Sequence, residues 1–208
     1  PPACGCPKCL ATGPFYGAAV QEVGRIAASG DFETGKGSVV SVDVIDAYVT
    51  RLAQDYKGRR DLTVAWDCGN GAAGEVVRRL VGKLPGKHIL LFDDIDGKFP
   101  NHHPDPAVAK NLVDLQKAVA AHKCDAGVAF DGDADRFGAV DERGEILWAD
   151  TIMAVYAAEV LREHPGTPVI ADVKSSRVLF DEIARLGGKP IMWNTGHSLI
   201  KAKMRSEE

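Results

Sequence analysis

Apolar residues recur every three to four positions in two stretches near the amino end of the chain. The first stretch covers residues 16–29 and is followed by Gly30, a residue type that often ends helices. The second covers residues 41–52. Because this spacing puts apolar side chains on one face of a helix, we predict two amphipathic helices joined by a loop over residues 31–38. The first helix is expected to pack through its apolar face.

From Leu62 onward, short runs rich in β-branched and aromatic residues alternate with helical patterns. The predicted strands are residues 62–66, 88–92, 126–130, 137–140, 146–148, 168–173 and 190–193. The predicted helices are residues 72–81, 107–122, 151–162 and 177–186. Strands joined by helices are typical of parallel sheets, and a turn at residues 142–144 adds an antiparallel hairpin. The pattern therefore predicts an α/β fold with mixed, mostly parallel sheets sandwiched by helices.

Two finer expectations follow from the same pattern. Residues 126–130 are apolar throughout, which predicts a strand buried on both faces. The strand and helix order starts afresh near Asp150, which indicates two related α/β domains. The second of these ends at residue 208, before a sheet of ordinary size is complete.

The composition fits a globular protein and narrows the choice of partners. The chain has 208 residues, 45% of them hydrophobic, and its 25 basic and 29 acidic residues give a formal charge of −4. This balance disfavours nucleic acids and anionic membranes as partners. No apolar run approaches the roughly 20 residues needed to cross a bilayer. The five cysteines, an odd number, indicate free thiols in a reducing cytoplasm.

Three of the cysteines, Cys4, Cys6 and Cys9, form a cluster at the amino end. Thiolates at such spacings can share a zinc ion, but a structural zinc site has four ligands and the cluster has no second pair or matching histidine. We therefore interpret the cluster as accessible thiols and keep zinc binding as an alternative.

The most specific pattern in the sequence is a run of alternate carboxylates. Asp131, Asp133 and Asp135 directly follow the predicted strand at residues 126–130, at the end where open α/β sheets bind ligands. Carboxylates so close together repel one another unless a cation is present, and their hard oxygen atoms suit Mg²⁺ or Ca²⁺. The alternative is a solvated acidic turn. An EF-hand is disfavoured, because its sixth position would be glycine and is Arg136 here.

Cationic and hydroxyl side chains at strand ends extend this candidate site. Arg136 is well placed to hold a phosphate that also touches the metal, although it could instead balance the carboxylate charge. Lys174 follows one predicted strand, and His197 and Ser198 follow the next, so adjacent parallel strands would bring them to one edge. Such groups suit a phosphorylated, polyhydroxylated ligand.

Two more loops have unusual compositions. Residues 97–106, the histidine loop, contain His102 and His103 between prolines. These histidines are either ligands or bases, or they hydrogen-bond the backbone of their own loop. Residues 67–71, the glycine turn, read Asp-Cys-Gly-Asn-Gly and open a helix that could receive an anion at its amino terminus. The turn lacks a full G-x-G-x-x-G pattern, so support for dinucleotide binding is weak.

Together these segments resemble the α-D-phosphohexomutases, in particular the bacterial phosphomannomutase/phosphoglucomutase branch. The resemblance rests on four ordered segments, which are residues 67–71 (Asp-Cys-Gly-Asn-Gly), 96–106 (Asp-Gly-Lys-Phe-Pro-Asn-His-His-Pro-Asp-Pro), 130–136 (Phe-Asp-Gly-Asp-Ala-Asp-Arg) and 193–201 (Trp-Asn-Thr-Gly-His-Ser-Leu-Ile-Lys). It implies repeated α/β domains and an isomerase that moves a phosphoryl group between the 1- and 6-positions of a hexose. The implied route passes through a phosphoserine and a hexose 1,6-bisphosphate intermediate.

The resemblance also implies roles for single residues. Asp131, Asp133 and Asp135 match the family's Mg²⁺ ligands, whose fourth protein contact is the phosphoserine. Arg136 matches the arginine beside that phosphate, and Lys8 stands at the spacing of a lysine in the serine loop.

In the last part of the chain, Lys174 and His197 match residues of the family's third domain that contact the sugar phosphate and help proton transfer. Ser198 beside them is expected to bind substrate as well.

By the same resemblance, residues 1–40 correspond to the end of domain 1, residues 41–149 to domain 2 with the metal-binding loop, and residues 150–208 to the first part of domain 3. Pro1 and Pro2 match the last two residues of the serine loop, so we expect the serine to lie outside this chain. The chain is then a fragment without activity of its own. Its partners would be a sugar phosphate and the missing domains of the same protein.

Two other functions stay open on the sequence alone. A phosphatase resembling the haloacid dehalogenases also has Asp-x-Asp after a buried strand and would use Asp131 as its nucleophile. A metal-binding or interaction module without chemistry of its own would make the cysteine cluster the relevant feature.

Overall fold

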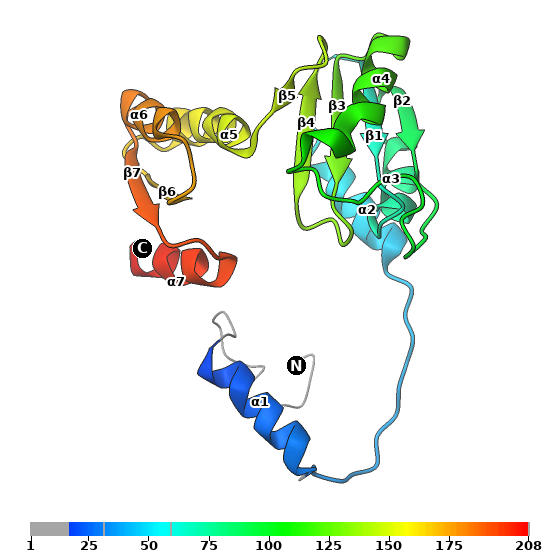
Figure 1. Cartoon of the computed structure of the whole chain (residues 1–208), viewed down its shortest axis with the longest axis vertical. Coiled ribbons are helices and arrows are strands. Elements are labelled where there is room, and N and C mark those ends of the chain that lie inside the picture. The colour runs from blue at the N-terminus through cyan, green and yellow to red at the C-terminus, as the bar shows by residue number, and fades with distance from the viewer. Residues whose placement is uncertain (1–16, 31, 59, 208) are drawn as a thin grey trace. The chain divides into compact units, whose positions relative to one another are not determined.

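The computed structural model describes residues 17–30, 32–58 and 60–207 (Figure 1). The chain divides into two compact units. Ser41–Ile152 form one, here called the five-stranded unit, and the other takes in the residues up to Val40 and from Met153 onward. Residues from Met153 onward are here called the two-stranded unit. In the described part of the chain, no helix is both long and apolar enough to span a membrane.

The first two helices are α1 (Ala18–Ser29) and α2 (Ile45–Gln54). None of the residues of α1 is buried by the described part of the chain, so packing of α1 through its apolar face stays a prediction. An apolar stripe favours a helix, but burying that stripe also needs a partner surface. Helix α2 starts at Ile45, whose backbone amide donates a 3.0 Å hydrogen bond to the Asp43 carboxylate. Its Val49 is fully buried.

The five-stranded unit contains one mixed sheet. Its strands are β1 (Leu62–Asp67), β2 (Gly86–Leu91), β3 (Ala126–Phe130), β4 (Phe137–Asp141) and β5 (Ile146–Leu147). Their order is β2-β1-β3-β4-β5, with β1 parallel to both β2 and β3. Strand β4 pairs antiparallel with β3 and with β5. The predicted fold class, a mixed and mostly parallel α/β sheet, is confirmed.

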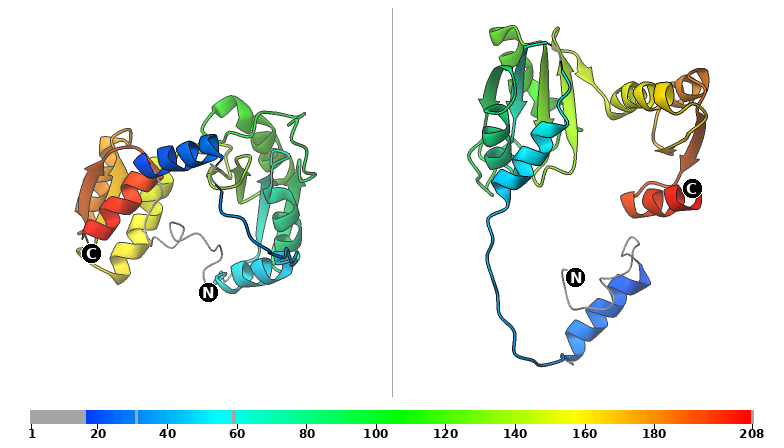
Figure 2. Two further views of the ribbon diagram at one scale, coloured as in Figure 1. Left: turned by 90° about the horizontal axis from the view of Figure 1, so that it is seen from below. Right: turned by 180° about the vertical axis from the view of Figure 1, so that it is seen from behind.

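Helices cover both faces of this sheet (Figures 1 and 2). Helix α4 (Val113–His122) covers one face, and α3 (Ala73–Val81) covers the other. The α4 side has the larger core, formed by Ala65, Leu112, Leu115, Ala118, Val119, Cys124, Ala129 and Val140. The predicted helix at residues 107–122 consists of two elements in the structure, a 3-10 turn (Ala109–Leu112) followed by α4.

The burial of strand β3 differs from the sequence prediction. The prediction that it is buried on both faces is wrong, because Gly127 and Ala129 are buried while the other three residues are only partly buried. Alternate side chains of a strand face opposite sides of the sheet. Gly127 lies under Leu115 and Val119 of α4, whereas Phe130 packs toward the smaller cluster on α3. An apolar run alone does not reveal how completely each face is covered.

The two-stranded unit contains β6 (Pro168–Asp172) and β7 (Lys189–Trp193), which are parallel. Its helices are α5, which begins in the preceding unit (Ala149–Glu163), α6 (Arg177–Arg185) and α7 (His197–Glu207). Its core is formed by Ala157, Leu161, Val169, Ala171, Leu179 and Ile183. Helix α7 was not predicted from the sequence, because its few apolar residues do not set a clear period.

Cys68, which follows β1 directly, gives a test of this packing. It is fully buried, and burial raises the pKa of its thiol to about 12, with the nearby carboxylates of Asp93 and Asp67 adding to the effect. At pH 8 such a thiol is ionised in about one molecule in 10,000, and only the thiolate reacts. We therefore expect iodoacetamide to leave Cys68 unmodified in the native chain and to modify it in urea. Peptide mapping by mass spectrometry measures both, and rapid labelling of the native chain would contradict the packing.

Candidate metal centre

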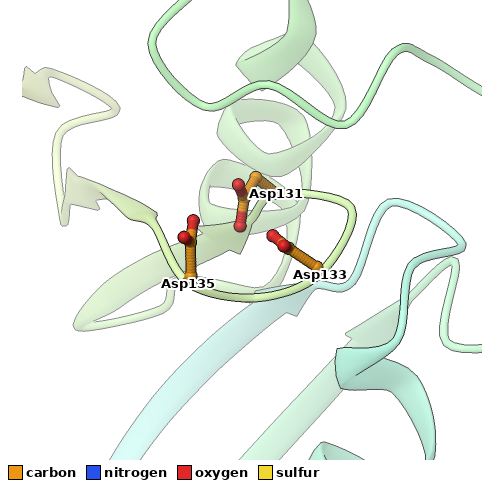
Figure 3. A group of neighbouring side chains, drawn as sticks. All are labelled: Asp131, Asp133 and Asp135. Carbon is orange, nitrogen blue, oxygen red and sulfur yellow. The ribbon is translucent and has the colours of Figure 1, made fainter. Parts of the chain in front are cut away.

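The three aspartates of the sequence motif lie in one loop at the carboxyl end of β3. This metal loop, residues 131–136, connects β3 to β4. One carboxylate oxygen from each of Asp131, Asp133 and Asp135 lies within 4.8 Å of the others. Figure 3 shows the three side chains directed toward one common space. Asp131 is buried and the other two are exposed, so the group is anchored on one side and open to solvent on the other.

A tight turn brings these alternate side chains together. The backbone amide of Ala134 donates a 3.2 Å hydrogen bond to the Asp131 carbonyl, and Ala134 has a left-handed φ of 62°. That conformation is uncommon for a residue with a side chain. The amide of Asp131 donates to the carbonyl of Arg136 at 3.2 Å, which closes the loop at its base. The curvature of the loop, rather than side-chain flexibility, therefore sets the direction of the carboxylates.

Asp131 is held by Arg136 through both of its carboxylate oxygens. The Arg136 backbone amide donates to Oδ1 at 3.0 Å, and Nε of its guanidinium donates to Oδ2 at 2.8 Å. Burial alone would raise the pKa of Asp131, but the amide and the guanidinium of Arg136 outweigh it and hold the pKa below its usual value. Asp131 is therefore anionic at neutral pH, in the form that binds a cation. The guanidinium also lies 3.4 Å from the Asp105 carboxylate.

The donor set fits a hard divalent cation. In the described part of the chain, the group that could hold a metal contains carboxylates only. Oxygen ligands suit Mg²⁺, which keeps several water molecules and is usually held by a few carboxylates together with substrate phosphates. The exposed side of the group leaves room for such additional ligands. The amino-terminal cysteine cluster and Lys8 lie outside the described residues.

The start of the helix that follows the glycine turn contacts the metal loop. The backbone amide of Ala72, at the amino terminus of α3, donates a 2.9 Å hydrogen bond to the carbonyl of Gly132. That amide is therefore used within the protein, and anion binding by the rest of the helix terminus stays a prediction.

His102 is a hydrogen-bonded structural residue, one of the two alternatives that the sequence left open. Its Nε2 lies 2.9 Å and 3.1 Å from the two carboxylate oxygens of Asp67, and its Nδ1 lies 3.0 Å from the His103 carbonyl. Its ring also meets the edge of Phe92, with 5.4 Å between the centroids. Sequence reasoning did not connect His102 with Asp67, although an acidic residue at the end of a buried strand is a signal that such a partner exists.

The other predicted site residues that the structure describes lie in the two-stranded unit; they are Lys174, His197 and Ser198. Lys174 lies in the loop after β6, with Nζ 3.8 Å from Asp172. His197 and Ser198 begin α7, which follows β7. The Thr195 hydroxyl donates a 3.1 Å hydrogen bond to the Asp172 carboxylate, which joins the two loops. Since β6 and β7 are parallel, Lys174, His197 and Ser198 all lie at the carboxyl end of the same sheet.

Comparison with known families assigns the class of protein. Residues 46–144 match the phosphoglucomutase/phosphomannomutase alpha/beta/alpha domain II, and residues 148–208 match alpha/beta/alpha domain III of the same family. The chain therefore belongs to the phosphoglucomutase/phosphomannomutase family. Phosphohexomutases of this kind generally depend on Mg²⁺.

Individual relatives agree with this assignment. The chain is 45% identical over 170 residues to a phosphomannomutase/phosphoglucomutase of Pseudomonas syringae pv. tomato, covering 82% of this chain and 37% of the relative. It is 42% identical over 188 residues to a phosphoglucomutase of Neisseria meningitidis serogroup B, covering 89% and 41%. A solved structure of a family protein from Burkholderia thailandensis has a TM-score of 0.87 at 45% identity, covering 92% of this chain and 42% of that one. The chain thus spans about two fifths of the length of these relatives.

Proposed function

We propose that this chain forms the metal-binding part and a portion of the sugar-phosphate site of a phosphohexose mutase. The reaction is the transfer of a phosphoryl group between the 1- and 6-positions of a hexose, through a phosphoserine and a hexose 1,6-bisphosphate. One observation carries the proposal: three carboxylates converge beside Arg136 at the end of β3 in a chain of this family. Sugar phosphates are the substrates typical of such enzymes.

In this proposal, Asp131, Asp133 and Asp135 hold Mg²⁺. The bound ion supplies positive charge that stabilises the transferred phosphoryl group, and phosphoryl transfer relies mostly on positioning and charge of this kind. Arg136 uses Nε to fix Asp131, while its side chain remains 58% exposed. Nη1 also faces the Asp105 carboxylate at 3.4 Å, and the N–H groups of Nη2 are then available to a phosphate oxygen beside the metal loop.

The two-stranded unit supplies contacts to the sugar phosphate in this proposal. Lys174 offers a cation at the carboxyl end of β6, where its side chain is 72% exposed. His197 offers an imidazole that can donate or accept a proton, and Ser198 offers a hydroxyl to the same ligand. The hydrogen bond between Thr195 and Asp172 keeps their two loops together.

The phosphatase alternative fits the geometry less well. Both oxygens of Asp131 accept hydrogen bonds from Arg136, which makes them weaker nucleophiles and still leaves lone pairs for a cation. The family assignment also favours the mutase.

A chimera tests the proposed function in a complete enzyme. Residues 46–208 would replace the matching segment of the Pseudomonas syringae relative, and the product would be assayed with glucose 1-phosphate, Mg²⁺ and hexose 1,6-bisphosphate. We expect conversion to glucose 6-phosphate without release of inorganic phosphate. A chimera that folds and binds Mg²⁺ but does not convert the substrate would contradict the proposal. Phosphate release that is lost in Asp131→Asn would instead support the phosphatase.

A further inference from the structure

A buried, hydrogen-bonded aspartate–histidine pair lies next to the metal loop without belonging to it. Asp67, the last residue of β1, has a side chain that is 0% exposed, and the side chain of His102 is 12% exposed. Each carboxylate oxygen of Asp67 faces Nε2 of His102, and Oδ1 also accepts a 2.9 Å hydrogen bond from the Gly69 amide. Burial raises the pKa of Asp67, although His102 and the Gly69 amide act against this rise. A carboxyl group buried in this way is tolerated only when it is hydrogen-bonded.

The hydrogen bonds of His102 use both nitrogens of its ring. Nδ1 faces the His103 carbonyl, which can only accept, so Nδ1 carries a proton and donates it. Nε2 faces the carboxylate of Asp67, so a second proton lies between these two groups. Neither nitrogen is left to bind a metal or to act as a base. The pair is therefore a cross-link between the glycine turn and the histidine loop.

These two segments contact the metal loop from two sides. Next to the glycine turn, the Ala72 amide donates to the Gly132 carbonyl at 2.9 Å. From the histidine loop, the Asp105 carboxylate lies 3.4 Å from Nη1 of Arg136, whose Nε holds Asp131. The position of the metal loop therefore depends on the spacing between the glycine turn and the histidine loop.

A second cross-link connects the same two segments. The Asn101 side-chain amide donates to Oδ1 of Asn70 at 2.8 Å, and the Asn70 amide group donates to the Asp94 carbonyl at 2.8 Å. The two segments are thus joined by two side-chain cross-links, and the amide of Asp96, directly before the histidine loop, also donates to the Asn70 carbonyl at 3.0 Å.

We propose that His102 is a positioning residue for the metal centre. Through Asp67 it fixes the two segments that contact the metal loop at Gly132 and Arg136, and so it keeps Asp131 and Asp133 in the arrangement that binds the cation. This inference rests on the proposed function, because it takes the metal loop to bind Mg²⁺. It assigns His102 no contact with metal or substrate.

Two substitutions separate the two hydrogen bonds of His102. Asparagine places its amide near the position of Nδ1 and does not reach Asp67, whereas glutamine places its amide near the position of Nε2 and does. We expect His102→Asn to weaken Mg²⁺ binding about tenfold, a typical cost when groups that support metal ligands are lost. We expect His102→Gln to recover most of that loss. His103→Ala is the matched control, because His103 is exposed and its side chain has no hydrogen-bond partner among the described residues.

The measurement is isothermal titration of the whole 208-residue chain with MgCl₂, paired with thermal unfolding in EDTA. A residue that only stabilises the fold would lower the unfolding temperature in EDTA and leave the Mg²⁺ dissociation constant unchanged. A positioning residue raises the dissociation constant itself. Equal dissociation constants for wild type and a folded His102→Asn would overturn the inference.

A second pair of variants keeps the test decisive if His102→Asn, which leaves a buried charge unpaired, does not fold. Asp67→Ala removes the charge and the cross-link together, whereas Asp67→Asn keeps an acceptor for Gly69 and offers an amide to His102. We expect about tenfold weaker Mg²⁺ binding for Asp67→Ala and near wild-type binding for Asp67→Asn. Equal binding by both would overturn the inference. If the wild-type chain itself binds no Mg²⁺, the metal centre of the proposed function fails first, which is a separate result.

Discussion

Replacing Asp133 with asparagine is expected to weaken Mg²⁺ binding by about 100-fold or more, because a direct carboxylate ligand contributes at least as much as the groups that support it. The amide keeps the size of the side chain and removes its charge. Asp133 is exposed, and its side chain has no hydrogen bond or ion pair with the other described residues. In EDTA the unfolding temperature should be unchanged or slightly raised, because the substitution removes one of three carboxylates that repel one another without a cation. Calorimetric titration with MgCl₂ measures the loss of affinity.

Glu142→Gln is the matched control for this variant. Glu142 is an exposed acid between β4 and β5, and its ion pair is a distant one, with 4.0 Å to Nε of Arg143. The control removes one negative charge from the same unit without touching the metal loop. We expect its Mg²⁺ affinity to equal that of wild type. An equal loss in Glu142→Gln and Asp133→Asn would mean that the chain attracts the cation through its overall charge, and the three-aspartate site would then be wrong.

The metal loop could be found from the sequence because its signals are local. Alternate carboxylates after an apolar strand are visible in seven consecutive residues, and strand ends of open α/β sheets are where ligands bind. The class of fold was also accessible, since each strand and helix is encoded by a short period of apolar residues. The place of Arg136 beside the metal loop was also visible in the sequence, because its partner Asp131 lies only five positions away.

What the sequence did not reveal depends on contacts between distant segments. Asp67 and His102 are 35 positions apart, and nothing in either loop specifies which acid the histidine meets. The strand order β2-β1-β3-β4-β5 decides that question, because it sets β1 beside β3 and so brings the glycine turn next to the metal loop. The hydrogen bond from the Ala72 amide, at the amino terminus of α3, to the Gly132 carbonyl also depends on β1 lying beside β3. Side-chain partners of this kind are fixed by the topology rather than by local pattern.

Because β1 lies beside β3, Gly71 at the end of the glycine turn lies directly against the backbone of the metal loop. A β-carbon at Gly71 would lie 2.7 Å from the Gly132 carbonyl oxygen and 3.1 Å from the Asp131 carbonyl oxygen. Both atoms belong to the backbone of the metal loop, so neither can turn aside as a side chain would. Interiors packed to this density respond to an added methyl group by strain or by displacement of the backbone.

Gly71→Ala is therefore expected to lower the free energy of unfolding by about 2–3 kcal/mol, the upper part of the usual range for overpacking. It should also weaken Mg²⁺ binding, because the displaced segment carries Asp131 and Asp133. Urea unfolding in EDTA measures the first effect, and calorimetric titration measures the second.

Gly97→Ala is the control that isolates the contact at Gly71. A β-carbon there would meet no atom within 4 Å, and Gly97 lies in the histidine loop. It carries the same change of glycine to alanine, with the same effect on the flexibility of the unfolded chain, so we expect stability and Mg²⁺ affinity near those of wild type. If Gly71→Ala matched this control in both measurements, the metal loop would have room to move without cost. Support from the glycine turn could then not be what holds the three aspartates in place.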